Sequence, residues 1–364
     1  MAELETHAPD LPPPASTVGM LGWLRKNLFS TWYNVVLTVL SLYLLYLVIP
    51  ALVSWAFIDA TFAGEGREAC DKEGACWIFV RIRFWQFFYG FYPAAERWRV
   101  NLTVLVGLAA VVWVLAERTP WKKWVTIFLC LFYPVLAYFI LLGDAFGLVY
   151  VETGKWGGLF LTLVIAAVGI AASLPIGIFL ALGRRSGMPV IRMMCIGFIE
   201  TVRAVPLITV LFMASIMLPL FLPPGTNFDV LMRALIGVAL FSAAYMAEVV
   251  RGGLQAIDRG QYEGAQALGL SYWKMMGLII LPQALKVVIP AIVSTFIGLF
   301  KDTTLVLIIG LLDLLAMVQL AVTDAKWIGL ATEGYVFAGL TFWVFCFGMS
   351  RYSVYLEHKL DTGY

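Results

Sequence analysis

Histidine is nearly absent from this sequence. Only His7 and His358 occur among 364 residues, and both lie near the ends of the chain. An enzyme that used histidine as a general base or as a metal ligand would have no candidate in the body of the chain. No serine or paired-carboxylate constellation stands out either. We therefore expect no catalytic residues, no metal site and no enzymatic activity.

Charge is also scarce. Lys, Arg, Asp and Glu make up 13% of the residues, and 62% are hydrophobic, whereas about 25% of an ordinary soluble domain is charged. A soluble domain of this length could not hide so much apolar surface. The same figures exclude a disordered chain. What remains is a polytopic membrane protein, in which several segments each cross about 30 Å of hydrocarbon.

Nucleotide and nucleic-acid binding patterns are missing as well. The net charge is only +2 and no basic block occurs, so we expect no nucleic-acid partner. The phosphate-binding pattern G-x4-G-K-[ST] is absent, because Gly154-Lys155 is followed by Trp156. The chain therefore does not hydrolyse ATP by that motif, and we expect it to bind no cofactor.

Long apolar runs dominate what is present. They predict an all-α membrane protein with about eight transmembrane helices. The runs cover residues 34–58, 101–116, 124–142, 158–182, 204–222, 230–250, 283–300 and 334–350. Arg25 and Lys26 precede the first run, so we expect the N-terminal tail, residues 1–33, to stay in the cytoplasm. An even number of spans then places both termini there.

The loops differ in charge. Basic residues are concentrated in the loops predicted to face the cytoplasm, among them Arg184, Arg185 and Arg192, as the positive-inside rule requires. The outer loop 59–99 carries charges of both signs, but loops of this length follow the rule poorly. Its aromatic stretch 84–89 predicts an interfacial helix.

Two cysteines, Cys70 and Cys76, share that outer loop. They can form a disulfide if the loop faces an oxidising compartment, and otherwise they are free thiols.

One predicted cytoplasmic connection, residues 251–285, has the pattern of an ordered structure. Residues 260–268 predict a short helix, Gly269 is a natural residue to end it, and Ser271 can cap the next helix. We call residues 260–280 the knob. From these features alone, the knob is either a structured linker or a surface that docks another protein.

The spacing around the knob resembles the EAA loop of ABC importer permeases, E-A-A-x3-G-x9-I-x-L-P. The matching residues are Glu263, Gly264, Ala265, Gly269, Ile279, Leu281 and Pro282. Gly264 stands where the pattern has alanine, and glycine weakens a helix by up to about 1 kcal/mol relative to alanine. In that family the loop docks into a groove on the ATPase subunit. The resemblance therefore implies that these residues couple the chain to an ATPase.

Further stretches are similar to permeases for polar amino acids. They are 199–206, with Glu200 and Arg203; 243–253, with Glu248 and Arg251; 281–284; and 301–305, with Lys301, Asp302 and Thr303. The resemblance covers roughly residues 158–357 and implies the five-helix type I permease core there. Residues 34–150 lie outside it, as a three-helix N-terminal membrane extension with 59–99 as its periplasmic loop. Such an extension resembles that of a permease subunit of general L-amino-acid transport systems.

This resemblance implies a permease subunit that moves amino acids across the bacterial inner membrane. A periplasmic amino-acid-binding protein would deliver the solute, and a homologous second permease subunit would pair with this chain in the lipid bilayer. ABC ATPase subunits would bind the knob. ATP and Mg would be used by the ATPase, with no cofactor bound to this chain.

Two pairs of opposite charges fall near the ends of predicted spans. An isolated charge at mid-bilayer costs at least about 2.5–3.5 kcal/mol. Glu200 and Arg203 lie three residues apart, as do Glu248 and Arg251, so each pair can share a helix face and neutralise itself. Each is either a structural ion pair or part of a cytoplasmic gate.

Lys301 and Asp302 are adjacent and cannot face each other on one helix. Together with Thr303 they are candidates for the translocation pathway. The sequence leaves two alternatives: one of the two charged residues faces the solute path, or neither does. As a pair they would complement the amino and carboxylate groups of a zwitterion.

A secondary transporter driven by an ion gradient is the alternative. It would predict inverted repeats with broken helices in both halves of the chain. The sequence shows no such repeat, and this alternative leaves the knob unexplained.

Overall fold

The computed structural model describes residues 19–70, 73–116, 119–144, 147–221, 223 and 228–360. Residues 1–18, most of the expected N-terminal tail, lie outside the described residues. The chain divides into two compact units, Met1–Ile78 and Phe79–Tyr364.

The first unit is built on one apolar helix. α1 (Gly19–Asn27) is followed by α2 (Trp32–Val53), which continues as a π-helical turn, Ser54–Ile58. α2 buries none of its own residues against protein. A helix that is apolar all round and exposed along its length is suited to lipid rather than to water.

The segment after α2 folds back on the end of that helix. The Thr61 N–H donates to the Ala75 carbonyl (2.8 Å), and Trp77 Nε1 donates to the Ala56 carbonyl (2.8 Å). In the structure Cys70 and Cys76 form a disulfide, with their Cα atoms 5.5 Å apart. The disulfide and the hydrogen bonds together hold this segment against the end of the helix.

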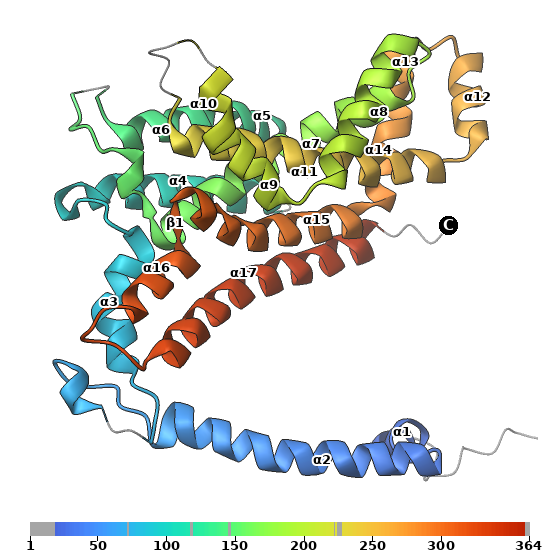
Figure 1. Cartoon of the computed structure of the whole chain (residues 1–364). Helices are drawn as coiled ribbons and strands as arrows, with labels where there is room; N and C mark the ends of the chain where they lie inside the picture. The colour runs from blue at the N-terminus through green and yellow to red at the C-terminus, as the bar shows by residue number, and fades with distance from the viewer. Residues whose placement is uncertain are drawn as a thin grey trace, which may run out of the picture. The chain divides into compact units, whose positions relative to one another are not determined.

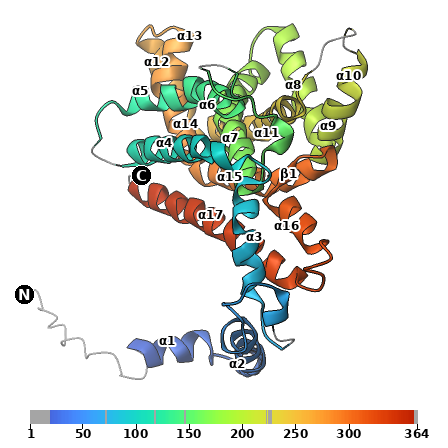
Figure 2. The same cartoon turned by 90° about the vertical axis from the view of Figure 1, so that its left-hand side faces the viewer.

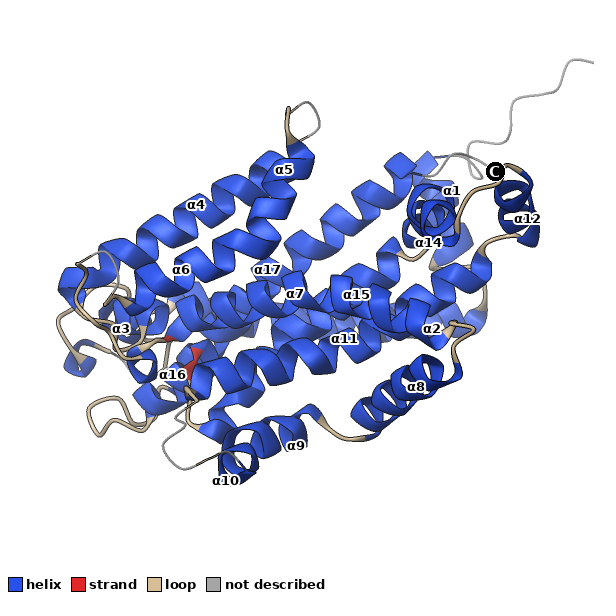
Figure 3. Cartoon of the chain, turned by 90° about the horizontal axis from the view of Figure 1, so that it is seen from above, coloured by secondary structure: helices blue, strands red, loops and turns tan. Residues whose placement is uncertain are grey.

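The second unit contains the remaining helices and one short strand (Figures 1 and 2). They are α3 (Trp77–Tyr89, which begins just before the boundary), α4 (Arg97–Leu115), α5 (Lys122–Ile127), α6 (Tyr133–Leu142), α7 (Gly158–Arg184), α8 (Pro189–Ala204), α9 (Leu207–Phe212), α10 (Leu218–Phe221), α11 (Val230–Ala256), α12 (Arg259–Ala267), α13 (Tyr272–Met275), α14 (Leu281–Val287), α15 (Ile289–Asp302), β1 (Leu312–Asp313), α16 (Leu314–Val322) and α17 (Ala331–Leu360). π-helical turns join α5 to α6, α9 to α10 and α13 to α14. α7 packs most extensively on α11, and Figure 3 shows α7, α11 and α15 together at the centre of this unit.

Among the described residues, six helices are long and apolar enough to cross a membrane, or seven if one bent pair counts as a single span. They are Trp32–Ile58, Ala94–Leu115, Lys122–Leu142, Gly158–Arg184, Val230–Ala256 and Ile289–Ile309. This all-helical membrane architecture agrees with the expected fold class. The run at 334–350, expected as an eighth span, lies in α17, where glycines and the polar residues at both ends dilute the apolar stretch.

The bent pair is α8 and the segment Leu207–Phe221, which contains α9 and α10; the two axes differ by 105°. Val205 is extended (φ −110°, ψ 147°) and Pro206 follows it. The residue before a proline avoids the helical region, and proline has no N–H to donate. The expected span 204–222 is therefore the second arm of a broken helix.

Two buried clusters hold the second unit together. The first, which we call the extension core, joins α4 and α6 to the start of α7 and to α11; it includes Val100, Leu141, Trp156, Phe160 and Leu231. The second, the knob core, joins the ends of α7 and α11 to the knob; it includes Leu182, Leu254, Ala265, Met275 and Ile280.

α3 contains the aromatic stretch 84–89 that is expected to form an interfacial helix. Phe79 and Phe87 of this helix are fully buried. The ring centroid of Phe79 lies 5.4 Å from that of Trp327, and the centroid of Phe87 lies 5.5 Å from that of Phe337. Arg83 also forms an ion pair with Asp324. One face of α3 is therefore packed against the segment around α16 and α17, while Phe84 and Trp85 are exposed; the interfacial placement of 84–89 stays a prediction.

Candidate functional site

The knob is an ordered helix–turn–helix. Asp258 caps α12 by accepting from the Gly260 N–H (2.6 Å). At the other end Gly269 has φ +69°, with its N–H bonded to the Gln266 carbonyl and the Leu270 N–H bonded to the Ala265 carbonyl. This is the Schellman arrangement that glycine favours at a helix C-terminus. Figures 1 and 2 show α12 and α13 standing out from the rest of the second unit.

The residues predicted to couple to an ATPase lie on different faces of the knob. Glu263 and Gly264 are exposed, whereas Ala265 is 2% exposed and belongs to the knob core. Ile279 and Leu281 pack against the same core. The small side chain of Ala265 lets α12 pack closely against the ends of α7 and α11 in the knob core. Glu263 and Gly264 remain accessible to a partner.

The second half of the knob is less regular than a single helix. Ser271 occupies the N-cap position of α13, but its side chain makes no capping hydrogen bond. After four residues the helix widens into the π-helical turn Met276–Ile280, and Pro282 then lies in the first turn of α14. Proline cannot donate to a carbonyl one turn earlier, and here it directly follows the π-helical turn, where the regular hydrogen-bond ladder is already interrupted.

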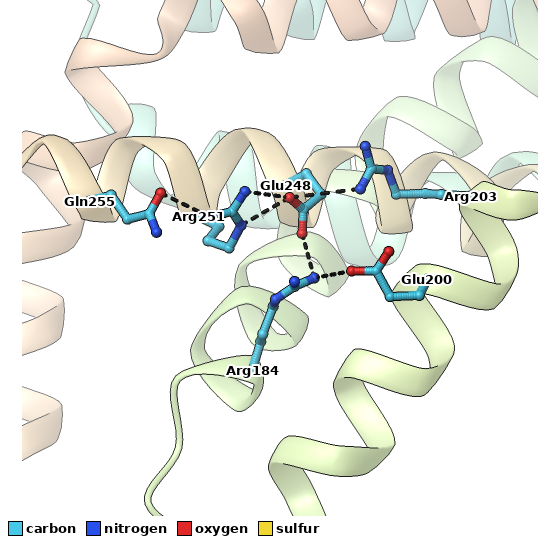
Figure 4. A network of polar contacts seen from close by, with 6 residues as sticks. All are labelled: Arg184, Glu200, Arg203, Glu248, Arg251 and Gln255. Carbon is cyan, nitrogen blue, oxygen red and sulfur yellow. Dashed lines mark hydrogen bonds and ion pairs between the residues drawn. The ribbon is translucent and has the colours of Figure 1, made fainter.

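A charge cluster lies where α7, α8 and α11 meet (Figure 4). Arg184 Nη1 donates to Glu200 Oε1 (2.8 Å) and to Glu248 Oε1 (2.7 Å). Arg251 Nε and Nη2 both donate to Glu248 Oε2 (2.9 and 2.7 Å). Arg203 Nη1 lies 3.7 Å from the same oxygen. Glu248 therefore faces three arginines that come from three helices.

One expected pairing in this cluster is wrong. Glu200 and Arg203 do share a helix, but they bond outward, Glu200 to Arg184 and Arg203 to Glu248. The expected Glu248–Arg251 pair does form. The three-residue spacing places both residues of a pair on one face, but neighbouring helices offer partners with better geometry.

Arg184 is one residue whose role the sequence does not reveal. The charge pattern places it only in a basic loop, yet it ends α7 and bridges two carboxylates. Its position in the last turn of a long apolar helix is the signal that could have identified it, because cations favour that end of a helix.

The residues 301–303 do not form one polar site. Lys301 is exposed, Asp302 is half-buried, and Thr303 is buried with its hydroxyl donating to the Phe300 carbonyl (2.8 Å). Thr303 therefore satisfies the end of α15 instead of presenting its hydroxyl to a solute. Lys301 and Asp302 remain candidates for the pathway.

Asp313 is a second residue missed from the sequence. Its side chain is fully buried at the N-terminus of α16, where it accepts from the Ala316 N–H (3.0 Å) and the Leu315 N–H (3.2 Å). Burial raises the pKa of this carboxyl to about 6, and the two N–H groups oppose the rise. The backbone of Asp313 also bridges to Gly158 at the start of α7. A single Asp beside an apolar run carries no clear sequence signal.

Comparison with known proteins identifies the family of the chain. Residues 173–362, more than half of the chain, match the family of the binding-protein-dependent transport system inner membrane component. The inner membrane amino-acid ABC transporter permease protein YhdY of Escherichia coli (strain K12) is 54% identical, over 97% of this chain and 96% of that protein.

Two further proteins are similar. The glutamate/glutamine/aspartate/asparagine transport system permease protein BztC of Rhodobacter capsulatus is 42% identical, over 96% of this chain and 95% of that protein. A crystal structure of an amino acid ABC transporter with histidines is 28% identical, with a TM-score of 0.49; the match covers 56% of this chain and 92% of that one. By the family match and the whole-length relatives, the chain belongs to the inner membrane components of binding-protein-dependent transport systems.

Proposed function

We propose that this chain is the permease subunit of an ATP-driven amino-acid importer. Two relatives that match almost its whole length are amino-acid permeases by name. The observation that carries the proposal is the knob, which stands out from the second unit while one buried core joins it to the ends of α7 and α11. A partner that moves the knob would therefore move spans.

The division of labour follows from that role. Residues 158–357 are the permease core and 251–285 its coupling loop, while 34–150 are an N-terminal extension whose loop 59–99 is periplasmic. Both termini are cytoplasmic. A separate ABC ATPase uses ATP and Mg, and this chain binds no cofactor. A periplasmic binding protein delivers the amino acid, and a homologous second permease completes the pathway.

The charge cluster supports a gate at the cytoplasmic side. It joins α7, α8 and α11 through Glu200, Arg203, Glu248 and Arg251, with Arg184 as the bridge. Ion pairs between helices can exchange partners when the helices shift, so such a cluster can hold one arrangement and release it in another. Lys301 and Asp302 are proposed to lie along the pathway.

Uptake by the complex reconstituted in vesicles tests the class of transporter. We expect amino-acid uptake that needs ATP and stops with vanadate. Uptake that ignores vanadate but collapses with an ionophore would instead identify a gradient-driven secondary transporter.

The coupling role of the knob needs its own test. Gly269→Pro should break the turn at φ +69°, and Glu263→Lys should reverse an exposed charge. We expect both variants to insert into the membrane normally and to lose either co-purification of the ATPase or transport. Normal transport in both variants would remove the coupling role.

A further inference from the structure

Helix α7 ends at two consecutive arginines that serve different parts of the second unit. Arg184, the last residue of α7, belongs to the charge cluster, whereas Arg185, the C-cap residue that follows it, reaches the knob. Arg185 Nη1 donates to the Tyr262 hydroxyl (3.1 Å) and to the Leu254 carbonyl (3.1 Å). The C-terminal end of α7 therefore contacts both structures.

The contact between Arg185 and Tyr262 has two components. The Tyr262 hydroxyl accepts a hydrogen bond from Arg185. The guanidinium carbon of Arg185 also lies over the Tyr262 ring, 5.6 Å from its centroid. This is the geometry of a cation–π contact. The Tyr262 hydroxyl in turn donates to the Leu254 carbonyl (3.1 Å). Arg185 of α7, Tyr262 of α12 and Leu254 of α11 therefore form a closed triangle.

The third corner of the triangle explains why it forms at this point. Leu254 lies in the last turn of α11, which ends at Ala256. The last four carbonyls of a helix have no intrahelical donor and need other partners. Leu254 itself is buried in the knob core, so its carbonyl takes both donors from Arg185 and Tyr262. The polar end of α11 thus becomes the joint between α7 and the knob.

At this joint, apolar contacts determine how close the helices lie, and hydrogen bonds determine their orientation. The knob core holds α12 close to α7 and α11, but apolar contacts are not directional. Hydrogen bonds depend steeply on angle, so the triangle sets the orientation of α12 relative to α7.

We propose that Arg185 is a positioning residue, which fixes the knob to α7 so that a movement of the knob is passed to α7 and, through the adjacent Arg184, to the charge cluster. The inference rests on the proposed function of the knob as the ATPase contact. Without Arg185 the ATPase would still bind and hydrolyse ATP, but fewer cycles would open the pathway.

The test compares solute transported with ATP hydrolysed. Full complexes carrying wild type, Arg185→Ala, Arg185→Lys or Arg192→Ala are reconstituted, and both quantities are measured in the same vesicles. Arg192 is an exposed arginine on α8, so its variant removes the same charge from a neighbouring helix. For Arg185→Ala we expect unchanged co-purification of the ATPase and a fall in solute per ATP of about twofold to tenfold.

The other variants separate position from charge. Lysine keeps the charge but not the planar fork of the guanidinium, so Arg185→Lys should lie between wild type and Arg185→Ala. Arg192→Ala should keep the wild-type ratio. Tyr262→Phe keeps the ring and removes only the hydroxyl, and it should lower the ratio in the same direction. If Arg185→Ala fails to assemble, Tyr262→Phe decides the matter.

Two results would contradict the inference, and they are distinguishable. A wild-type ratio in both Arg185→Ala and Tyr262→Phe, in complexes that show vanadate-sensitive uptake, would overturn the role of Arg185 alone. A wild-type complex without ATP-driven uptake would overturn the proposed function and this inference with it.

Discussion

Glu248 is the residue on which the charge cluster depends. Its side chain is 15% exposed and faces Arg184, Arg203 and Arg251, whereas the side chain of Glu200 is 55% exposed and pairs with Arg184. Arginines brought together in a partly desolvated site need the carboxylate between them. An exposed pair contributes little because water and salt screen it.

This difference predicts unequal effects of two identical substitutions. Glu248→Gln leaves three arginines facing a neutral amide, so we expect a loss of about 2–4 kcal/mol of stability. Glu200→Gln should cost less than about 1 kcal/mol. Thermal unfolding of the purified protein in mild detergent measures both. Equal losses in the two variants would show that Glu248 is not the centre of the cluster.

Asp313 predicts how stability depends on pH. Burial raises the pKa of this carboxyl to about 6, above its ordinary value of 3.8. Between those values the folded state binds a proton that the unfolded state does not. Stability should therefore rise as the pH falls through 6 towards 4, by at most about 3 kcal/mol. Thermal unfolding at pH 5 and pH 8 reveals the change.

Two asparagine variants make this test specific. Asp313→Asn can still cap α16 but does not titrate, so its stability should change less between pH 5 and pH 8. Asp324→Asn is the control, because the Lys326 N–H and Arg83 hold the pKa of the Asp324 carboxyl below its usual range. If the stability of Asp313→Asn depends on pH as strongly as that of the wild type, another group is responsible for the pH dependence.

At the scale of elements, the knob was the most predictable part of the chain. The helix expected at 260–268 is α12 at 259–267, and Gly269 ends it with a positive φ. Both features follow from local sequence, since a glycine after a short helix allows a left-handed turn.

The partners in the charge cluster could not be predicted in the same way. Which carboxylate Arg184 meets depends on how α7, α8 and α11 cross, and no spacing within one helix contains that information. The same holds for the π-helical turn Met276–Ile280, of which Met276 and Ile280 are buried in the knob core. Local sequence indicates that a helix is present, whereas tertiary packing decides where it widens.

Two helical glycines give the prediction at this scale. A Cβ at Gly264 would meet nothing within 4 Å, whereas a Cβ at Gly253 would lie 2.5 Å from the Ala284 carbonyl oxygen. We expect Gly264→Ala to strengthen α12 by up to about 1 kcal/mol, seen as slower amide hydrogen exchange in α12, with transport retained. Gly253→Ala should instead destabilise the contact of α11 with α14. Faster exchange in Gly264→Ala would mean that α12 needs the glycine for some other contact.

At the scale of the whole molecule, the second and third expected spans are continuous with the permease core. Arg99 of α4 is buried; it pairs with Glu96 (2.7 Å) and donates to the Val149 carbonyl (2.8 Å) just before α7. The Tyr92 hydroxyl donates to the Leu141 carbonyl at the end of α6 (2.8 Å). The boundary between the compact units falls near residue 78, whereas the sequence resemblance to permeases begins near residue 158.

Two truncations distinguish these boundaries. In each, a cleavable signal sequence replaces the N-terminal residues, 1–76 or 1–150, so that the remaining chain starts on the outer side in both cases. Loss of 1–76 removes the span α2, which buries none of its residues in the first unit, and should leave the thermal unfolding of the rest unchanged. Loss of 1–150 also removes α3, α4 and α6, which pack on the rest of the second unit, so the midpoint should fall by more than about 5 °C. If both truncated proteins unfold at the same temperature, α3, α4 and α6 do not support the core; if only the longer deletion is destabilised, these three helices are a structural part of the permease and α2 is a separate anchor.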